Sequence, residues 1–206
     1  LKKCPQFNFM SISLIIPIGA DNIEYENYMP YIFNFAPDGI SLCIKSIQGL
    51  DLNRFDNIYF TILEKYDKKY YLSLLLKLQF KKLGLSNAKV VVLDEPTTSQ
   101  AETVYRTVNC ENIEGAIFVK DPDGYFCGDF TIANSIAIYP LDKLEMVNPR
   151  NKSYVELDDQ FYITNIIEKK SSAVSLMQEV IFLMMLLCSA NIMRDYICMN
   201  NFLCRI

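Results

Sequence analysis

The sequence predicts an α/β fold with a mostly parallel, Rossmann-like sheet that carries helices on both faces. Three observations support this prediction. Short apolar runs recur along the chain, as in strands that are buried on both sides. Segments with apolar residues at helical spacing lie between them, and Gly or Pro closes several of the runs. This alternation of strands and helices is typical of a parallel sheet.

The first strand is expected in a continuous apolar run that ends in Gly, and later strands follow at regular intervals. Ligands of such sheets bind beyond the carboxyl ends of the strands, so the segments that follow the strands matter most for function. In chain order, the expected strands lie in residues 11–20 (SISLIIPIGA), 57–64 (NIYFTILE), 88–96 (AKVVVLDEP), 115–126 (GAIFVKDPDGYF), 135–142 (SIAIYPLD) and 161–170 (FYITNIIEKK).

Two helices are expected between these strands. Residues 69–84 have apolar residues at helical spacing, a basic last turn and Gly84 as a stop signal. Residues 99–110 begin with Ser99 as an N-cap, and Glu102 follows three positions later, which is the pattern of a capping box.

Composition limits the classes of function. The 206 residues carry a net charge of −4 and no basic run, which disfavours nucleic-acid binding. Seven cysteines without a CxxC pair, and no apolar segment after the first lysines, predict a cytoplasmic protein with reduced thiols. The chain has no histidine. Ser–His and Cys–His catalysis are therefore excluded, and carboxylates become the expected ligands of a hard metal ion.

Three segments at strand ends carry candidate chemistry. Asp121 and Asp123 form a short acidic pair in which a divalent cation could bind a diphosphate; the alternative is a solvated D-P-D-G turn. Residues 97–100 (TTSQ) place hydroxyls and an amide at a helix N-terminus, which suits a base edge or a phosphate; the alternative is simple capping. Glu168 and Lys169 could hold sugar hydroxyls and a phosphate, or form an exposed salt-bridged strand end.

Taken in order, these segments resemble the sugar-phosphate nucleotidyltransferases, a family built on the A-type glycosyltransferase (nucleotide-diphospho-sugar transferase) fold. The resemblance covers roughly residues 12–170 and includes MPYIFNFAPDG before a helix, EPTTSQAETVY, DPDGYF and IIEKK. It implies Mg²⁺ (or Mn²⁺) as cofactor, a nucleoside triphosphate or nucleotide sugar and a sugar phosphate as partners, and a place in polysaccharide biosynthesis.

By position, the resemblance also assigns the site residues. It places the metal on Asp123 with Asp121 as a helper, and it makes Asp123 and Lys169 the catalytic residues. The nucleotide would contact Gly19 and Ala20 in the first loop and Gln100 and Glu102 in the base-reading segment, and the sugar would contact Glu168 and Lys169.

The chain departs from the family pattern in its cations. The first loop, GADNIEYEN, has one Gly, three acidic residues and no Arg, where the family has a glycine-rich loop with an Arg. Tyr31 follows Pro30, where the family places a Lys. Phosphoryl transfer depends on cationic clamps, so we consider Lys45 and Arg106 as substitutes.

Residues 171–206 form a tail that fits neither a membrane span nor an amphipathic helix. The uncharged stretch at 180–193 is shorter than the roughly 18 residues that a span requires. Reading the codons one base out of frame permits GGYFF followed by a charged amphipathic segment, and GGYFF is a strand of the form that the family shows there. We therefore predict a nucleotidyltransferase-like domain at 1–170 and a frame-shifted translation at 171–206.

Three functions are compatible with the sequence. The first is Mg²⁺-dependent transfer of a nucleotidyl group to a sugar phosphate with release of diphosphate. The second is a glycosyltransferase that uses the Asp-x-Asp of residues 121–123 to bind a nucleotide sugar. The third is a non-catalytic, decayed protein that binds a nucleotide sugar, as the missing cations and the tail indicate.

Overall fold

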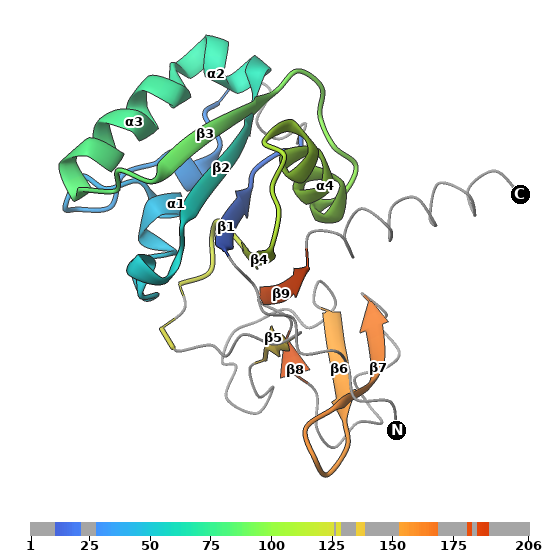
Figure 1. Ribbon diagram of the computed structural model, residues 1–206. Coiled ribbons are helices and arrows are strands. Elements are labelled where there is room, and N and C mark those ends of the chain that lie inside the picture. Colours follow the sequence, from blue (N-terminus) through green and yellow to red (C-terminus); the bar gives the residue numbers. More distant parts are fainter. Residues whose placement is uncertain are drawn as a thin grey trace, which may run out of the picture. The chain divides into compact units, whose positions relative to one another are not determined.

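Figure 1 shows the computed structural model of the chain. The residues that it describes are 11–21, 28–125, 127–128, 135–138, 153–168, 181–182 and 185–189. The chain divides into two compact units, one of residues Leu1–Asn134 with Leu187–Ile206 and one of residues Ser135–Leu186.

Four strands of the first unit pair in parallel, in the order β3-β2-β1-β4 (Figure 1). Their bounds are Ile12–Pro17 (β1), Asn57–Leu63 (β2), Ala88–Leu93 (β3) and Ala116–Lys120 (β4). All residues of β1 and β4 are buried, as expected of strands that are covered on both faces. The structure therefore confirms the predicted parallel sheet.

In the part of the chain that the structure describes, four α-helices and two 3₁₀ helices accompany these strands. The α-helices are α1 (Leu42–Lys45), α2 (Glu64–Tyr70), α3 (Leu72–Leu83) and α4 (Gln100–Cys110). The 3₁₀ helices are η2 (Tyr31–Phe33) and η3 (Leu52–Arg54).

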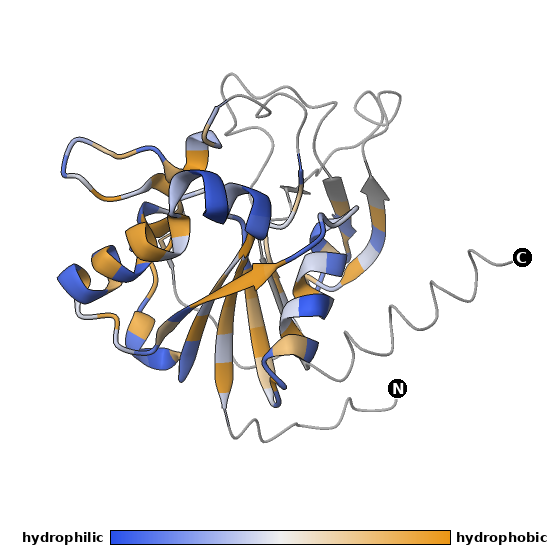
Figure 2. Ribbon diagram, turned by 90° about the horizontal axis from the view of Figure 1, so that it is seen from above, coloured by the Kyte–Doolittle hydropathy of each residue, from blue (hydrophilic) through white to orange (hydrophobic). Residues whose placement is uncertain are grey.

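Two neighbouring residues of β2 show that helices cover both faces of the sheet. Successive side chains of a strand point to opposite faces. The ring of Phe60 packs against Phe80 of α3, with the ring centroids 5.1 Å apart. The hydroxyl of Thr61 lies 2.6 Å from that of Thr107 in α4. Thus α3 and α4 lie on opposite sides, and Figure 2 shows the apolar strands running between helices.

The predicted helix at 69–84 is divided in two. Tyr71 adopts a left-handed conformation with φ 55° and separates α2 from α3. The Asp67 carboxylate then accepts hydrogen bonds from the backbone N–H and the hydroxyl of Ser73, at 2.7 and 2.8 Å, in the first turn of α3. Gly84 ends α3 in a left-handed conformation, as predicted.

A buried glutamine ties α3 to the start of α1. Gln79 accepts a hydrogen bond from the N–H of Ser41 and donates one to its hydroxyl, both at 2.7 Å. Cys43, the second residue of α1, is fully buried, and burial raises the pKa of its thiol to about 12. The segment that precedes α1 is therefore fixed at its carboxyl end.

The second unit contains an antiparallel sheet in the order β7-β6-β8. Its strands are β6 (Ser153–Leu157), β7 (Ile163–Glu168) and β8 (Ile181–Phe182), and β5 (Ser135–Ala137) also belongs to this unit. The predictions included β5 and β7 but omitted β6. A further strand, β9 (Met185–Ser189), lies in the tail. No helix of the described segments is long and apolar enough to cross a membrane.

Candidate nucleotide and metal site

The carboxyl ends of β1, β3 and β4 bring three of the predicted segments together. The chain leaves β1 through Gly19 and Ala20, and Ala20 forms an isolated parallel bridge with Thr97 after β3. The N–H of Thr97 donates a hydrogen bond of 2.9 Å to the carbonyl of Gly19. The first loop and the TTSQ segment therefore lie side by side.

Gly19 is required by the close approach of α4. A Cβ atom at this position would lie 2.7 Å from both Oγ1 and Cγ2 of Thr103 and 3.0 Å from Oγ1 of Thr97. The hydroxyls of these two threonines are themselves in contact at 2.6 Å. The glycine predicted to start the nucleotide loop thus allows the N-terminus of α4 to pack against that loop.

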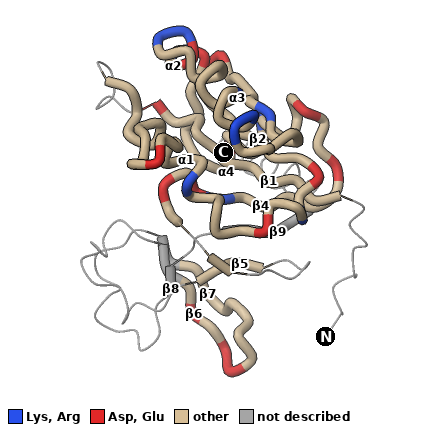
Figure 3. Tube along the Cα trace, turned by 90° about the vertical axis from the view of Figure 1, so that its left-hand side faces the viewer, with Lys and Arg blue, Asp and Glu red and all other residues tan. Residues whose placement is uncertain are grey.

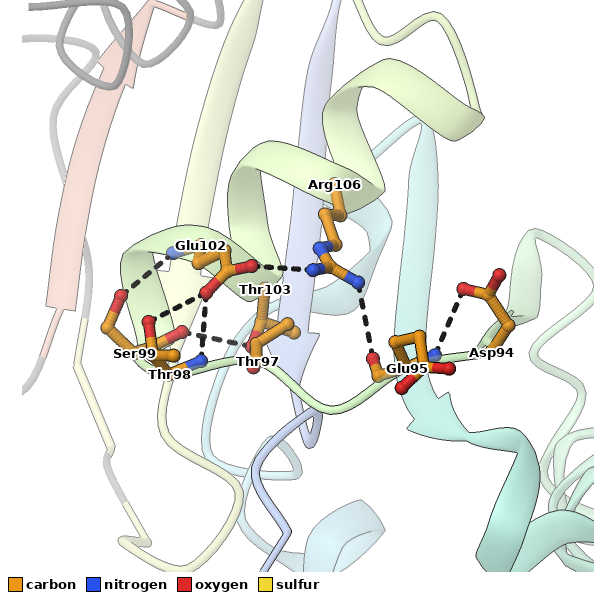
Figure 4. A network of polar contacts seen from close by, with 8 residues as sticks. All are labelled: Asp94, Glu95, Thr97, Thr98, Ser99, Glu102, Thr103 and Arg106. Carbon is orange, nitrogen blue, oxygen red and sulfur yellow. Dashed lines mark hydrogen bonds and ion pairs between the residues drawn. The ribbon is translucent and has the colours of Figure 1, made fainter. Parts of the chain in front are cut away.

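The cap of α4 uses the side chains that the sequence indicated (Figure 4). The Ser99 hydroxyl accepts a hydrogen bond of 3.2 Å from the N–H of Glu102. In return, Oε2 of Glu102 accepts from the backbone N–H and the hydroxyl of Thr98, each at 2.8 Å. The capping box is therefore confirmed, with the return contact made one residue before the N-cap.

Glu102 is engaged on both carboxylate oxygens, because Arg106 donates to Oε1 at 2.7 Å. The hydrogen bonds from Thr98, with that of Arg106, hold the pKa of Glu102 below its ordinary value. Its contacts are those of a helix cap. Its role in reading a base remains a prediction, and a base would have to share these oxygens.

The acidic turn after β4 lies against the start of α4. Gln100, the first residue of α4, donates a hydrogen bond from its amide to Oδ1 of Asp121. Tyr31 of η2 donates from its hydroxyl to Oδ2 of Asp123 at 2.8 Å. The structure thus joins two predicted site residues, Gln100 and Asp121, directly, and it adds Tyr31, which the family comparison had marked only as a departure.

The side chain of Lys120 binds two backbone carbonyls of the same turn. Its side chain is fully buried, and its ammonium donates to the carbonyl of Asp121 at 2.7 Å and to that of Gly124. Burial lowers the pKa of Lys120, while the charges of Asp121 and Asp123 oppose that shift. Lys120 was not among the predicted site residues. The available signal was a lysine at the end of an otherwise apolar strand, immediately before two aspartates.

A cation also lies beside the first loop. The ammonium of Lys65 is 3.1 and 2.9 Å from the two carboxylate oxygens of Asp21, and the Tyr66 hydroxyl donates to Asp21 at 2.6 Å. These contacts, that of Tyr66 foremost, lower the pKa of Asp21. Lys65 was also missed, because it comes from the start of α2 rather than from the loop itself.

The two substitute cations that we considered are paired elsewhere. Lys45 forms an ion pair with Asp38, and Arg106 bonds Glu102 and the carbonyl of Glu95. Figure 3 shows that acidic and basic residues are interspersed on the described part of the chain. The role of Lys45 and Arg106 as phosphate clamps remains a prediction.

The predicted sugar contacts belong to another part of the chain. Glu168 is the last residue of β7 in the second unit, and Lys169 lies outside the described residues. Their assignment to the site is therefore untested.

The donor set of the acidic turn fits a magnesium ion that is shared with a substrate. Among the described residues, no group of three or more His, Cys, Asp and Glu side chains could hold a metal. Asp121 and Asp123 offer two carboxylates. Mg²⁺ commonly binds to one or two carboxylates, keeps several waters and takes its other ligands from substrate phosphates.

The solved structures that match this chain include proteins whose names refer to nucleotides or nucleotide sugars. A nucleoside-diphosphate-sugar pyrophosphorylase from Vibrio cholerae RC9 matches with a TM-score of 0.63 and 14% identity, over 90% of this chain and 78% of that one. The inositol-1-phosphate CTP transferase from T. maritima matches with a TM-score of 0.61 and 15% identity, over 90% and 73%. HddC from Yersinia pseudotuberculosis, complexed with GMP-PN, matches with a TM-score of 0.57 and 15% identity, over 91% and 80%.

These matches define the class of fold. The chain has the sugar-phosphate nucleotidyltransferase-like fold, as the order of its motifs predicted. No protein-family model and no curated protein sequence matches the chain.

Proposed function

We propose that this protein is a sugar-phosphate nucleotidyltransferase that uses Mg²⁺ to transfer a nucleotidyl group to a sugar phosphate. The observation that carries the proposal is the junction of the acidic turn, the N-terminus of α4 and the first loop at one edge of the sheet. Gln100 contacts Asp121 there, and Thr97 pairs with Ala20. Fold similarity to proteins that handle CTP and nucleotide sugars supports the same class of substrate.

In the proposed reaction, a phosphate oxygen of the sugar phosphate attacks the α-phosphorus of a nucleoside triphosphate. A new P–O bond forms, the bond to the leaving diphosphate breaks, and the ionised sugar phosphate has no proton to lose. A Mg²⁺ ion on Asp123 and Asp121 would neutralise charge on the phosphates. Gln100 and the backbone amides at the start of α4 would orient the nucleotide.

The positive charge for the phosphates would come from lysines. Lys169 follows the strand end that resembles the sugar-contacting motif, and Lys65 stands beside the first loop. Lys65 is about half exposed on its side chain, at 49%, so a triphosphate could compete with Asp21 for its ammonium. Such clamps stabilise charge that develops during phosphoryl transfer.

The test is an assay of diphosphate release. The purified protein is incubated with Mg²⁺, each of the four nucleoside triphosphates and a panel of sugar 1-phosphates. We expect diphosphate release that depends on the sugar phosphate, and a loss of about 100-fold in the Asp123→Asn variant, because the metal contributes several kcal/mol to transition-state stabilisation. Asp159→Asn is the matched control, since Asp159 is an exposed aspartate in the turn between β6 and β7.

Other outcomes would favour the other two functions. Release of a nucleoside diphosphate from a nucleotide sugar would identify a glycosyltransferase, for which the Asp121–Asp123 pair is the supporting observation. No turnover with any substrate, together with unchanged behaviour of Asp123→Asn, would identify a non-catalytic protein. The engagement of Lys45 and Arg106 in ion pairs supports that last reading.

A further inference from the structure

We infer that Tyr31 is a positioning residue for the metal carboxylate: its hydroxyl fixes Oδ2 of Asp123 and leaves Oδ1 to the cation. This inference rests on the proposed function, because it gives Asp123 the role of metal ligand. The contact joins residues that are 92 positions apart, one before α1 and one after β4, with an oxygen–oxygen distance of 2.8 Å.

Tyr31 is held in place by its own segment. It is the first residue of η2, and Pro30 precedes it with φ −53°. The next two residues, Ile32 and Phe33, are buried and anchor the turn in the core. The backbone also closes on itself, since the N–H of Asn34 donates to the carbonyl of Tyr31 at 2.9 Å. A side chain on such an anchored turn presents its hydroxyl in a restricted region.

The backbone of the turn that carries Asp123 is also held in place. The ammonium of Lys120 binds the carbonyls of Asp121 and Gly124, which flank it in sequence. Pro122 fixes one further backbone angle within the turn. The backbone of the turn is thus set by Lys120, and the contact with Tyr31 sets the side chain of Asp123. A metal-binding carboxylate gains affinity when a neighbouring donor holds its orientation.

A tyrosine suits this position better than a lysine would in this chain. Lysine at position 31, as in the family that the sequence resembles, would place an ammonium beside Asp123 and compete with a cation for it. A phenol is uncharged at neutral pH and donates one hydrogen bond, so it orients the carboxylate and leaves its negative charge for the metal. The buried Lys120 ammonium already supplies one positive charge under this turn.

The experiment measures binding of Mn²⁺ alone, without nucleotide, by the electron paramagnetic resonance signal of the free ion. Four proteins are compared: wild type, Tyr31→Phe, Asp123→Asn and the control Tyr71→Phe. The side chain of Tyr31 is partly exposed, at 45%, and phenylalanine preserves its ring, so the fold should be retained; thermal unfolding checks this. Tyr71 is 71% exposed on the linker between α2 and α3 and tests the loss of a hydroxyl as such.

We expect Tyr31→Phe to weaken Mn²⁺ binding about tenfold, as loss of a contact behind a metal ligand commonly does. Tyr71→Phe should bind as wild type does, and Asp123→Asn should lose the site. Affinity of Tyr31→Phe equal to or tighter than wild type would overturn the inference, and so would wild-type protein that binds no Mn²⁺.

The diphosphate assay distinguishes a failure of the inference about Tyr31 from a failure of the proposed function. Turnover that depends on Asp123, combined with unchanged Mn²⁺ affinity in Tyr31→Phe, would remove the role of Tyr31 and leave the enzyme assignment intact. Absence of turnover, combined with weakened Mn²⁺ binding in Tyr31→Phe, would keep the positioning role and remove the enzyme assignment.

Discussion

Gly19 is a residue at which the first loop approaches α4 closely. The space that a side chain at this position would need is taken up by the hydroxyls of Thr97 and Thr103. A methyl group there would push either the loop or the helix outward, because the hydroxyls already touch each other. The need for glycine at this position therefore comes from packing between backbone and helix, before any ligand is considered.

Gly19→Ala should destabilise the protein by about 1–3 kcal/mol, the usual cost of overpacking. Urea unfolding of the variant measures this cost. The same substitution in a Thr103→Ala background should cost clearly less, because the two nearest atoms are then removed. Equal costs in both backgrounds would contradict the packing argument.

At the residue scale, candidate metal ligands are easier to predict from the sequence than the residues that hold them in place. The pair Asp121 and Asp123 stands out because two acids follow an apolar strand. Tyr31 and Lys120 could not be assigned in this way, since their contacts depend on the three-dimensional path of η2 and on the turn after β4. Tyrosine is too common to be a signal by itself, and the place of Lys120 at the end of an apolar strand marks the residue without giving its contacts.

The α4 helix shows that capping residues in the sequence can predict where a helix begins. Ser99 and Glu102 were predicted to cap it, and both do. The cap is charged, because Glu102 also pairs with Arg106 one turn later. Glu102 therefore couples the stability of α4 to pH.

The sign of this coupling follows from the lowered pKa of Glu102, whose ordinary value is 4.5. Its ionised form stabilises the folded state fully above about pH 4.5, and this contribution disappears as the pH falls through the lower folded pKa. Glu102→Gln should cost about 1 kcal/mol at pH 7, and the difference from wild type should shrink toward pH 3. Thermal unfolding from pH 3 to 7 measures it, with the exposed Glu114→Gln as control. A difference that stays constant with pH would rule out this coupling.

Other elements were predicted because their patterns are local. The buried strands and the Gly84 stop of α3 depend on residues within each segment, and all were found. The break at Tyr71 was missed, because no glycine or proline marks it, although Asp67 and Ser73, whose contact spans it, are only six positions apart. β6 was missed because its apolar pattern, SYVEL, is short.

At the scale of the whole molecule, the order of motifs predicted the fold, and solved structures with 14% and 15% identity share it. A fold can persist at such low identity because cores tolerate extensive apolar substitution when total volume and patterning are kept. The tail was harder to interpret. Two of its segments form the strands β8 and β9, and the frame-shift interpretation of residues 171–206 stays a prediction.

That prediction is tested by sequencing the gene across the codon of Lys170 and beyond that of Ile206. We expect one missing base after Lys170, with an open frame that reads through GGYFF. The repaired protein should then unfold at a higher temperature than the present chain, because a strand and an amphipathic segment would be added. An intact reading frame would show that the apolar tail is genuine.

The burial of Cys43 has a practical consequence. Its thiol is enclosed at the start of α1, whereas Cys110 and Cys127 are exposed. The thiolate is the nucleophile that attacks an alkylating reagent, so the exposed pair should be modified quickly and Cys43 only when the region around α1 opens. Mass spectrometry of the peptide that contains Cys43 would then measure the rate at which this region opens. The rate of Cys43 alkylation thus reports on opening of the region next to the segment that carries Tyr31.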